Sequence, residues 1–139
     1  MTPAFVIDCS ITMAWCFADE ESAAAALIQE RLVQEAALVP AHWFLEVTTV
    51  LAMAEKRQRI SAVDSSHFVH LLQELDIQVD HEFSARAFDH LLPLCRSHSL
   101  TGYDATYLDL AIRRQLPLAT LDDDLRRAAV SLGVSVLGK

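Results

Sequence analysis

The sequence has few of the residues that mark disordered, fibrous or disulfide-stabilised chains. It contains three Gly and four Pro in 139 residues, while 53% of its residues are hydrophobic. A chain of this composition can bury enough apolar surface to fold, so we expect neither disorder nor a low-complexity repeat. Its length is that of one domain, which we place over residues 1–139.

Cysteine and long apolar runs are scarce too. The three cysteines form no Cys-x-x-Cys pair and cannot all pair with each other, which favours a reducing, cytoplasmic environment. No basic segment precedes the first apolar run, so we expect no signal peptide. The apolar runs are far shorter than the roughly 20 residues that span a bilayer. We therefore expect a soluble protein that does not contact membranes.

Acidic residues outnumber basic ones. Lys and Arg total 11 against 19 Asp and Glu, so the formal net charge is −8 at pH 7. This balance argues against a passive basic surface for nucleic acid. Nucleic-acid binding remains compatible with it if some of the acids hold metal ions, because a bound cation reverses the local field.

Short apolar runs alternate with helical patterns. We expect strands at 4–7, 38–39, 77–79, 116–120 and 134–137, and helices at 19–35, 43–57, 61–75, 82–96, 101–114 and 123–132. Capping boxes at Ser61-x-x-Asp64 and Thr101-x-x-Asp104 mark two helix starts, and Pro93 should kink or end its helix. This alternation predicts the α/β class, with a three-layer α/β/α fold around a mainly parallel sheet.

Four acids occupy positions where such sheets form functional sites, beyond the carboxyl ends of strands. Asp8 and Asp122 each follow a predicted strand, Glu46 lies in an apolar helical stretch, and Asp104 lies in the first turn of a helix. Carboxylates beside buried strands are poorly solvated and repel each other. An oxygen-only set suits Mg²⁺ or Mn²⁺ and matches phosphodiester hydrolysis by a metal-activated water.

Each acid also has a structural explanation. Asp8 can simply end a strand, Glu46 can be a solvated helix residue, and Asp104 can serve only in its capping box. The acids at 122–124 can simply stabilise a helix N-terminus through the helix dipole. We assign Asp123 to a Thr120-x-x-Asp123 capping box.

The six histidines raise a zinc hypothesis, since His42 and Glu46 are spaced i,i+4 and His67 and His70 i,i+3. None forms an HExxH motif, so surface or packing roles are favoured.

Four segments match one family in order and spacing. They are FVIDCS (5–10), VP (39–40) with LEVTTVL (45–51), LTGYDATYLDLA (100–111) and LPLATLDDDL (116–125), which runs on to 128–129 and 133–134. In these segments the chain resembles the PIN-domain ribonucleases, and among them the VapC-type toxins of bacterial toxin–antitoxin pairs.

The resemblance implies a metal-dependent endoribonuclease that hydrolyses RNA with Mg²⁺ or Mn²⁺. Its catalytic and metal-binding residues would be Asp8, Glu46, Asp104 and Asp122. The resemblance further implies that Ser10 and Thr120 orient the metal site or the scissile phosphate, with Asp124 as a supporting residue. It also implies an inhibitory antitoxin partner and a homodimer.

Basic pairs and aromatic residues bear on RNA binding. Basic residues at 56–59, 113–114 and 126–127 could contact RNA phosphates, while helix-dipole compensation explains the first two groups equally well. We assign four aromatic residues to core or dimer contacts rather than to base stacking: Trp15, Phe17, Trp43 and Phe44.

Two other functions stay open as alternatives. Phosphoryl transfer through an aspartyl-phosphate needs Asp-x-Asp after the first strand or a lysine near a late strand end. The chain has Asp8-Cys9-Ser10 at the first position, and its only lysines are Lys56 and Lys139. A catalytically silent binding module is the second alternative, and a set of mutually repelling carboxylates argues against it.

Overall fold

A central parallel sheet organises the protein. The computed structural model describes residues 1–138. Its strands are β1 (Pro3–Ile7), β2 (Ala36–Pro40), β3 (Ile77–Asp80), β4 (Leu118–Ala119) and β5 (Val136–Leu137). All pair in parallel in the order β3-β2-β1-β4-β5. The central strand β1 has Phe5, Val6 and Ile7 fully buried, as expected where helices cover both faces.

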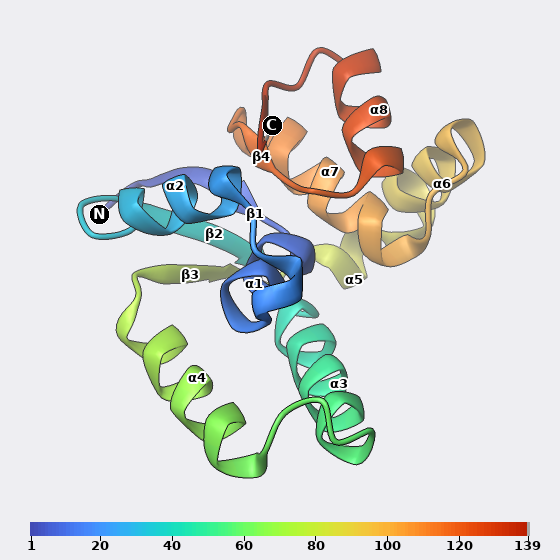
Figure 1. Ribbon diagram of the computed structural model, residues 1–139. Coiled ribbons are helices and arrows are strands. Elements are labelled where there is room, and N and C mark those ends of the chain that lie inside the picture. Colours follow the sequence, from blue (N-terminus) through green and yellow to red (C-terminus); the bar gives the residue numbers. More distant parts are fainter. Residues whose placement is uncertain (139) are drawn as a thin grey trace.

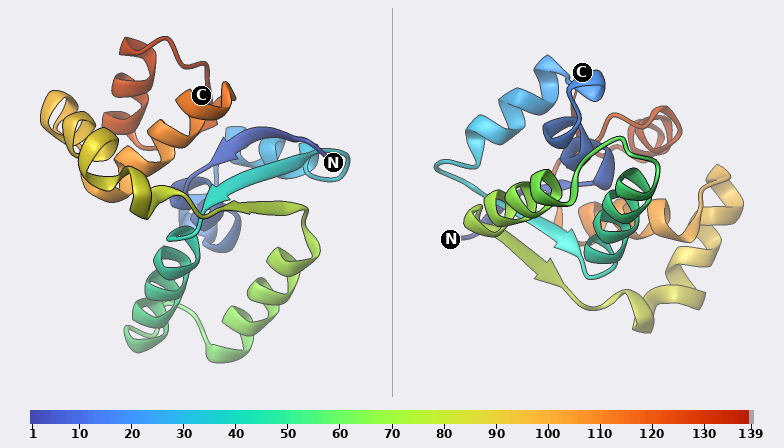
Figure 2. Two further views of the ribbon diagram at one scale, coloured as in Figure 1. Left: turned by 180° about the vertical axis from the view of Figure 1, so that it is seen from behind. Right: turned by 60° about the horizontal axis from the view of Figure 1, so that its bottom comes forward.

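Helices form the two outer layers. They are α1 (Cys9–Cys16), α2 (Ala23–Arg31), α3 (Trp43–Lys56), α4 (Ala62–Glu74), α5 (Phe83–Arg86), α6 (Leu92–His98), α7 (Gly102–Arg114) and α8 (Asp123–Ser131). In Figure 1, α2 lies in front of β1 and β2. Helix α7 packs on β1, β2 and β4 from the other face, as the reversed view in Figure 2 shows. The expected three-layer α/β/α architecture is therefore confirmed.

Helices α3 and α4 pack against each other and extend away from the side on which α6, α7 and α8 lie (Figure 1). No helix among residues 1–138 is long and apolar enough to cross a membrane. The three cysteines are free thiols.

Local hydrogen bonds explain where two of these helices begin. The Ser61 hydroxyl accepts a hydrogen bond from the backbone N–H of Asp64 at 3.0 Å, and α4 starts there. The Thr101 hydroxyl accepts one from the N–H of Asp104 at 3.1 Å at the start of α7. Both predicted helix starts are confirmed, because each hydroxyl satisfies an N–H group that has no partner inside the helix.

The segment expected to form a single helix over 19–35 has a shorter helix in the structure. Helix α2 covers only Ala23–Arg31, its cap is Ser22, and the separate 3-10 turn η1 (Ala18–Glu20) precedes it. Helix α1, directly after β1, was not expected. It forms because the Asp8 carboxylate accepts a hydrogen bond from the backbone N–H of Ile11 at 3.1 Å and so caps the helix.

The expected helix over 82–96 is divided into three segments. Between α5 and α6 the chain forms a π-helical turn, η2 (Ala87–Leu91). Pro93 does not end the helix, since α6 runs on to His98, but the π-helical turn comes directly before the first turn of α6, in which Pro93 lies. The expected irregularity is therefore present on the N-terminal side of Pro93, whose missing N–H removes one bond to the preceding turn. Strands β4 and β5 are shorter than expected, with two residues each.

Candidate active site

The candidate site lies where the order of the strands reverses. The chain passes from the central strand β1 to β2 on one side, and β4 later pairs with the opposite side of β1. Asp8 directly follows β1 and Thr120 directly follows β4. The carboxyl ends of two strands at such a reversal form the usual ligand-binding crevice of an open α/β sheet.

Asp8 is buried and held by hydroxyl groups on both oxygens. The residue is 4% exposed. Oδ1 accepts hydrogen bonds from the Ser10 hydroxyl at 2.6 Å and from the N–H of Ile11, and Oδ2 accepts one from the Thr120 hydroxyl. Burial and, to a smaller extent, the charge of Asp122 raise the pKa of Asp8 to about 6, although these hydrogen bonds act in the opposite direction.

Asp122 caps the helix that follows β4. Its Oδ2 accepts a hydrogen bond from the N–H of Leu125 at 2.8 Å, which makes Asp122 the N-cap of α8. The expected Thr120-x-x-Asp123 capping box was therefore wrong. The Thr120 hydroxyl bonds to Asp8 and accepts from the N–H of Asp122 at 3.0 Å, while Asp123 pairs with Arg126.

Ser10 makes a second connection between the two strand ends. Besides bonding to Asp8, its hydroxyl accepts a hydrogen bond from the N–H of Leu121 at 2.9 Å. The segments after β1 and β4 are thus joined through Ser10 and through Thr120, so that both expected hydroxyl groups lie at Asp8.

Asp104 lies in the first turn of α7 and is half-buried. Burial, together with the charges of four neighbouring carboxylates, raises the pKa of Asp104 to about 6. The four neighbours are Asp122, Asp8, Glu46 and Asp124. The charges of the other three acids singled out from the sequence therefore reach Asp104, as does that of Asp124, which places all of them in its neighbourhood.

Glu46 lies in the first turn of α3, and its carboxylate is held by α7. The Tyr107 hydroxyl donates a hydrogen bond to Glu46 Oε1 at 2.6 Å, and His42 Nε2 lies 3.0 Å from the same oxygen. Tyr107 is 1% exposed, and burial together with the charge of Glu46 raises its pKa. Its hydroxyl therefore remains a proton donor to Glu46.

Tyr107 was not among the residues expected in the site, and His42 was considered only for zinc. His42 is buried, and its ring packs near the rings of Phe83, Tyr103 and Tyr107, which agrees with a packing role. The spacing from Asp104 to Tyr107 could have indicated the contact with the site, because residues three apart share a helix face.

The chemistry of the acids fits a hard divalent cation. Within residues 1–138, no Lys or Arg forms an ion pair with any of the four acids Asp8, Glu46, Asp104 and Asp122. Carboxylate oxygens without a cationic partner are the ligands that Mg²⁺ and Mn²⁺ prefer. In the same range no three His, Cys, Asp or Glu side chains are already placed to hold a metal. A bound cation would therefore have to draw these carboxylates closer together.

Comparison with known proteins identifies the fold. The sequence matches the PIN domain family over residues 5–131, and no curated protein sequence matches it. PAE2754 from Pyrobaculum aerophilum has a similar structure, with a TM-score of 0.70, 21% identity, and coverage of 96% of this chain and 83% of that one. At this identity the likeness shows a shared fold.

Two further similar structures are those of a toxin and of a toxin–antitoxin complex. VapC20 from Mycobacterium tuberculosis, a sarcin-ricin loop cleaving toxin, has a TM-score of 0.63 at 13% identity, over 90% of this chain and 95% of that one. A toxin–antitoxin complex from Klebsiella pneumoniae has a TM-score of 0.60 at 16% identity, over 86% and 87% of the two chains. These similarities again concern the fold.

Proposed function

The chain belongs to the PIN domain family, and we propose that it is a metal-dependent endoribonuclease, the toxin of a toxin–antitoxin pair. One observation carries the proposal. Asp8 and Asp104, from different elements, both have a pKa raised to about 6 by burial and by neighbouring carboxylates. Such a set of repelling acids at a strand crevice costs stability and is typical of functional sites.

In this proposal four acids hold Mg²⁺ or Mn²⁺ and act in catalysis: Asp8, Glu46, Asp104 and Asp122. A cation bound there would lower the pKa of an attacking water and stabilise charge on the leaving oxygen of the phosphodiester. The chain's own groups prepare the site by fixing the carboxylates, since a ligand held by hydrogen bonds keeps its orientation.

Three further residues support these acids. Ser10 and Thr120 fix the two oxygens of Asp8 through their hydroxyl groups. Asp124 contributes negative charge near Asp104, which increases the attraction of the site for a cation.

We propose RNA as the substrate and an antitoxin protein as the inhibitory partner. The similarity to a sarcin-ricin loop cleaving toxin and to a toxin–antitoxin complex supports both proposals. We also propose that residues 1–139 are one domain, that the protein forms a homodimer, and that it acts in the cytoplasm.

The test is cleavage of a labelled RNA pool by the purified protein, stripped of any copurified inhibitor. The reaction is run with EDTA, with Mg²⁺ and with Mn²⁺. Asp104→Asn should abolish metal-dependent cleavage. Asp64→Asn is the matched control, because Asp64 holds the same position in the capping box of α4 but is exposed and lies outside the site. It should cleave like the wild type.

Metal binding separates the proposal from its main alternative. Calorimetric titration with Mn²⁺ should show binding by the wild type and by Asp64→Asn, and weaker binding by Asp104→Asn. If the folded wild type neither cleaves RNA nor binds Mn²⁺, the nuclease is excluded and a silent binding module takes its place.

A further inference from the structure

Tyr103 lies next to one acid of the candidate site along the chain and packs near His42, which contacts a second. It directly precedes Asp104 in the first turn of α7. Its ring centre is 5.6 Å from that of His42, with the planes inclined by 43°. His42 Nε2 in turn lies 3.0 Å from Glu46 Oε1. Tyr103 is thus joined to Asp104 along the chain and to Glu46 through the His42 ring.

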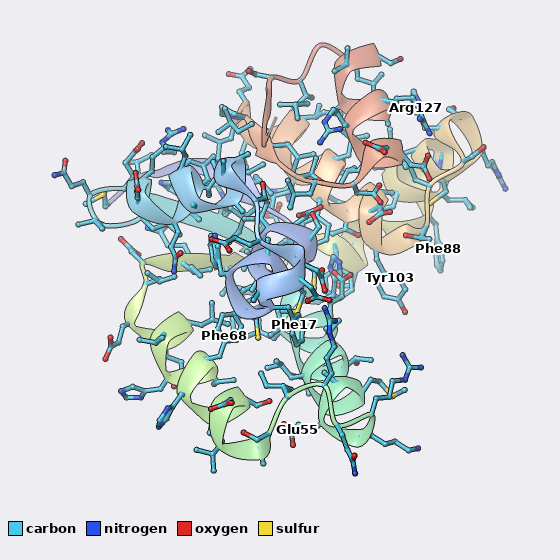
Figure 3. All side chains as sticks on the ribbon, viewed as in Figure 1. Phe17, Glu55, Phe68, Phe88, Tyr103 and Arg127 are labelled. Carbon is cyan, nitrogen blue, oxygen red and sulfur yellow. The ribbon has the colours of Figure 1, made fainter. Side chains whose placement is uncertain are left out.

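Most of the Tyr103 side chain is open to solvent. It is 62% exposed, whereas Tyr107, one turn further along the same helix, is 1% exposed. Figure 3 shows Tyr103 at the outside of the molecule, where its side chain leaves the start of α7. Since His42 lies against only part of the ring, the remaining aromatic surface is free for a ligand. An exposed tyrosine adds little to stability, because the free energy of burial scales with the apolar area removed from water.

The other aromatic residues considered for base stacking are less suitable. Phe17 and Trp43 are buried, and the indole N–H of Trp15 is bound to the carbonyl of Ala25 at 2.7 Å. Phe44 is partly exposed, but its ring packs edge-on against that of Trp43. Tyr103 differs from all four in being exposed beside Asp104.

Charge alone gives this protein little attraction for a polyanion. Most arginines are engaged by carboxylates, namely Arg31, Arg59, Arg86, Arg113, Arg114, Arg126 and Arg127. The net charge is −8, and the candidate site itself is acidic. Without a bound cation, an RNA strand near it therefore needs binding energy that does not depend on charge. Stacking of a base on an aromatic ring provides such energy, and single-stranded bases are free to stack.

We propose that Tyr103 is a stacking platform for a nucleobase of single-stranded RNA that lies next to the scissile phosphate, an inference that rests on the nuclease function proposed above. The base lies on the exposed part of the Tyr103 ring while His42 supports the ring from the other side. Tyr103 then positions the RNA relative to Asp104, and it favours unpaired RNA because a paired base is already stacked within its helix.

The first experiment measures RNA binding without cleavage. Asp8→Asn serves as the background, and the probe is a fluorescein-labelled pool of single-stranded 12-nucleotide RNAs, followed by anisotropy. Adding Tyr103→Phe, which keeps the ring, should leave the affinity within about twofold. Adding Tyr103→Leu, which keeps an apolar side chain without a ring, should weaken binding by about 5- to 100-fold, the range for one stacked base. Circular dichroism checks that each variant is folded.

A second measurement identifies the contact directly. The same RNA pool carrying 5-iodouracil is irradiated with the Asp8→Asn protein, and cross-linked peptides are identified by mass spectrometry. We expect the cross-link at Tyr103, its retention at the same position in the Tyr103→Phe variant, and its loss in Tyr103→Leu. A purely structural role for Tyr103 would not produce this pattern.

The outcomes separate this inference from the proposed function. Two results would overturn the stacking role even if the wild type cleaves RNA. One is that Tyr103→Leu binds RNA as tightly as its Asp8→Asn parent. The other is that Tyr103→Phe loses as much RNA affinity as Tyr103→Leu. RNA binding that depends on the ring, in a protein that never cleaves with Mg²⁺ or Mn²⁺, would support the platform and reject the nuclease. A wild type that neither binds nor cleaves RNA would reject both.

Discussion

The hydroxyl of Thr120 donates a hydrogen bond to Oδ2 of Asp8, across the boundary between the ends of β4 and β1. Thr120 is fully buried, and the same hydroxyl accepts a hydrogen bond from the N–H of Asp122. One side chain therefore fixes the distance between the first and the last of the four acids. Its position depends on the pairing of two strands that are more than a hundred residues apart in sequence.

Replacing this hydroxyl tests its contribution. We expect Thr120→Val, which has the same shape, to lower the metal-dependent cleavage rate by about 10- to 100-fold, as for other groups that orient a metal ligand. It should also lower the free energy of unfolding by about 1–3 kcal/mol, because the N–H of Asp122 loses its partner. Thr120→Ser is the control and should retain most activity. Cleavage kinetics and urea unfolding measure the two effects, and an unchanged rate in a folded Thr120→Val protein would contradict this role.

The Tyr107 hydroxyl should act on metal affinity through Glu46. Tyr107→Phe removes the 2.6 Å hydrogen bond while keeping the buried ring, so that Glu46 retains only the nearby His42 to restrain its rotation. We expect Mn²⁺ affinity to fall by about 10-fold or more, with the free energy of unfolding lowered by only about 1 kcal/mol. Mn²⁺ titration of both proteins is the measurement. Equal Mn²⁺ affinity would show that the site does not need this bond.

Stability without metal should fall as the pH rises toward the raised pKa of Asp8. That pKa is raised from 3.8 to about 6, so the folded protein binds this proton more tightly than the unfolded chain. The free energy of unfolding then decreases between about pH 4 and pH 6 and stays low above it. A shift of about 2 pH units corresponds to roughly 3 kcal/mol.

Asp8→Asn isolates this contribution from that of the other carboxyl groups. The stability of the variant relative to the wild type should increase from pH 4 to pH 7, because Asn carries no charge to bury. Urea unfolding in EDTA at several pH values measures the difference, and Asp64→Asn should show none. Mn²⁺ should restore stability to the wild type at pH 7 but not to Asp8→Asn. A pH-independent difference would mean that Asp8 has an ordinary pKa.

The α/β class, the parallel sheet and most helices could be predicted from the sequence, because they follow from periodicity and local capping. Ser61 and Thr101 cap helices through bonds to residues three positions away, so these starts are visible locally. The four acids could likewise be singled out, since strand ends and helix starts place them at one edge of the sheet.

Features that depend on distant contacts could not be predicted. The bond from Tyr107 to Glu46 joins residues 61 positions apart. The spacing from Asp104 places Tyr107 on the helix face toward the site, but nothing near Tyr107 in the sequence indicates that Glu46 is its partner. The family resemblance places Thr120 at the site, but the local pattern predicts a capping box with Asp123, and only the structure shows that the Thr120 hydroxyl bonds to Asp8 at the end of the neighbouring strand. The exposure of Tyr103 is also a tertiary property, since Tyr107 on the same helix is buried. In each case packing decided between alternatives that the local sequence left open.

Outside the site, Arg113 holds the end of β3 to the end of α7. Its guanidinium contacts both oxygens of Asp80 at 3.0 Å, and the Asp80 side chain is only 8% exposed. Arg113→Met removes the bidentate partner and leaves a buried carboxylate, so we expect a loss of about 3–5 kcal/mol in the free energy of unfolding. Arg114→Met is the matched control. Arg114 lies 3.7 Å from the same carboxylate and is more exposed, so its loss should cost at most about 1 kcal/mol.

The second substitution that tests this pair is Asp80→Asn in the Arg113→Met background. It removes a carboxylate charge that the first change leaves with only the longer, 3.7 Å contact to Arg114, so it should recover part of the lost stability. Urea unfolding of the four proteins in the cycle measures the coupling between the two residues. Because neither residue contacts the four acids, Mn²⁺ affinity of the folded Arg113→Met protein should equal that of the wild type. Additive losses would show that Asp80 does not depend on Arg113. A weakened Mn²⁺ site would show that the end of β3 helps to shape it.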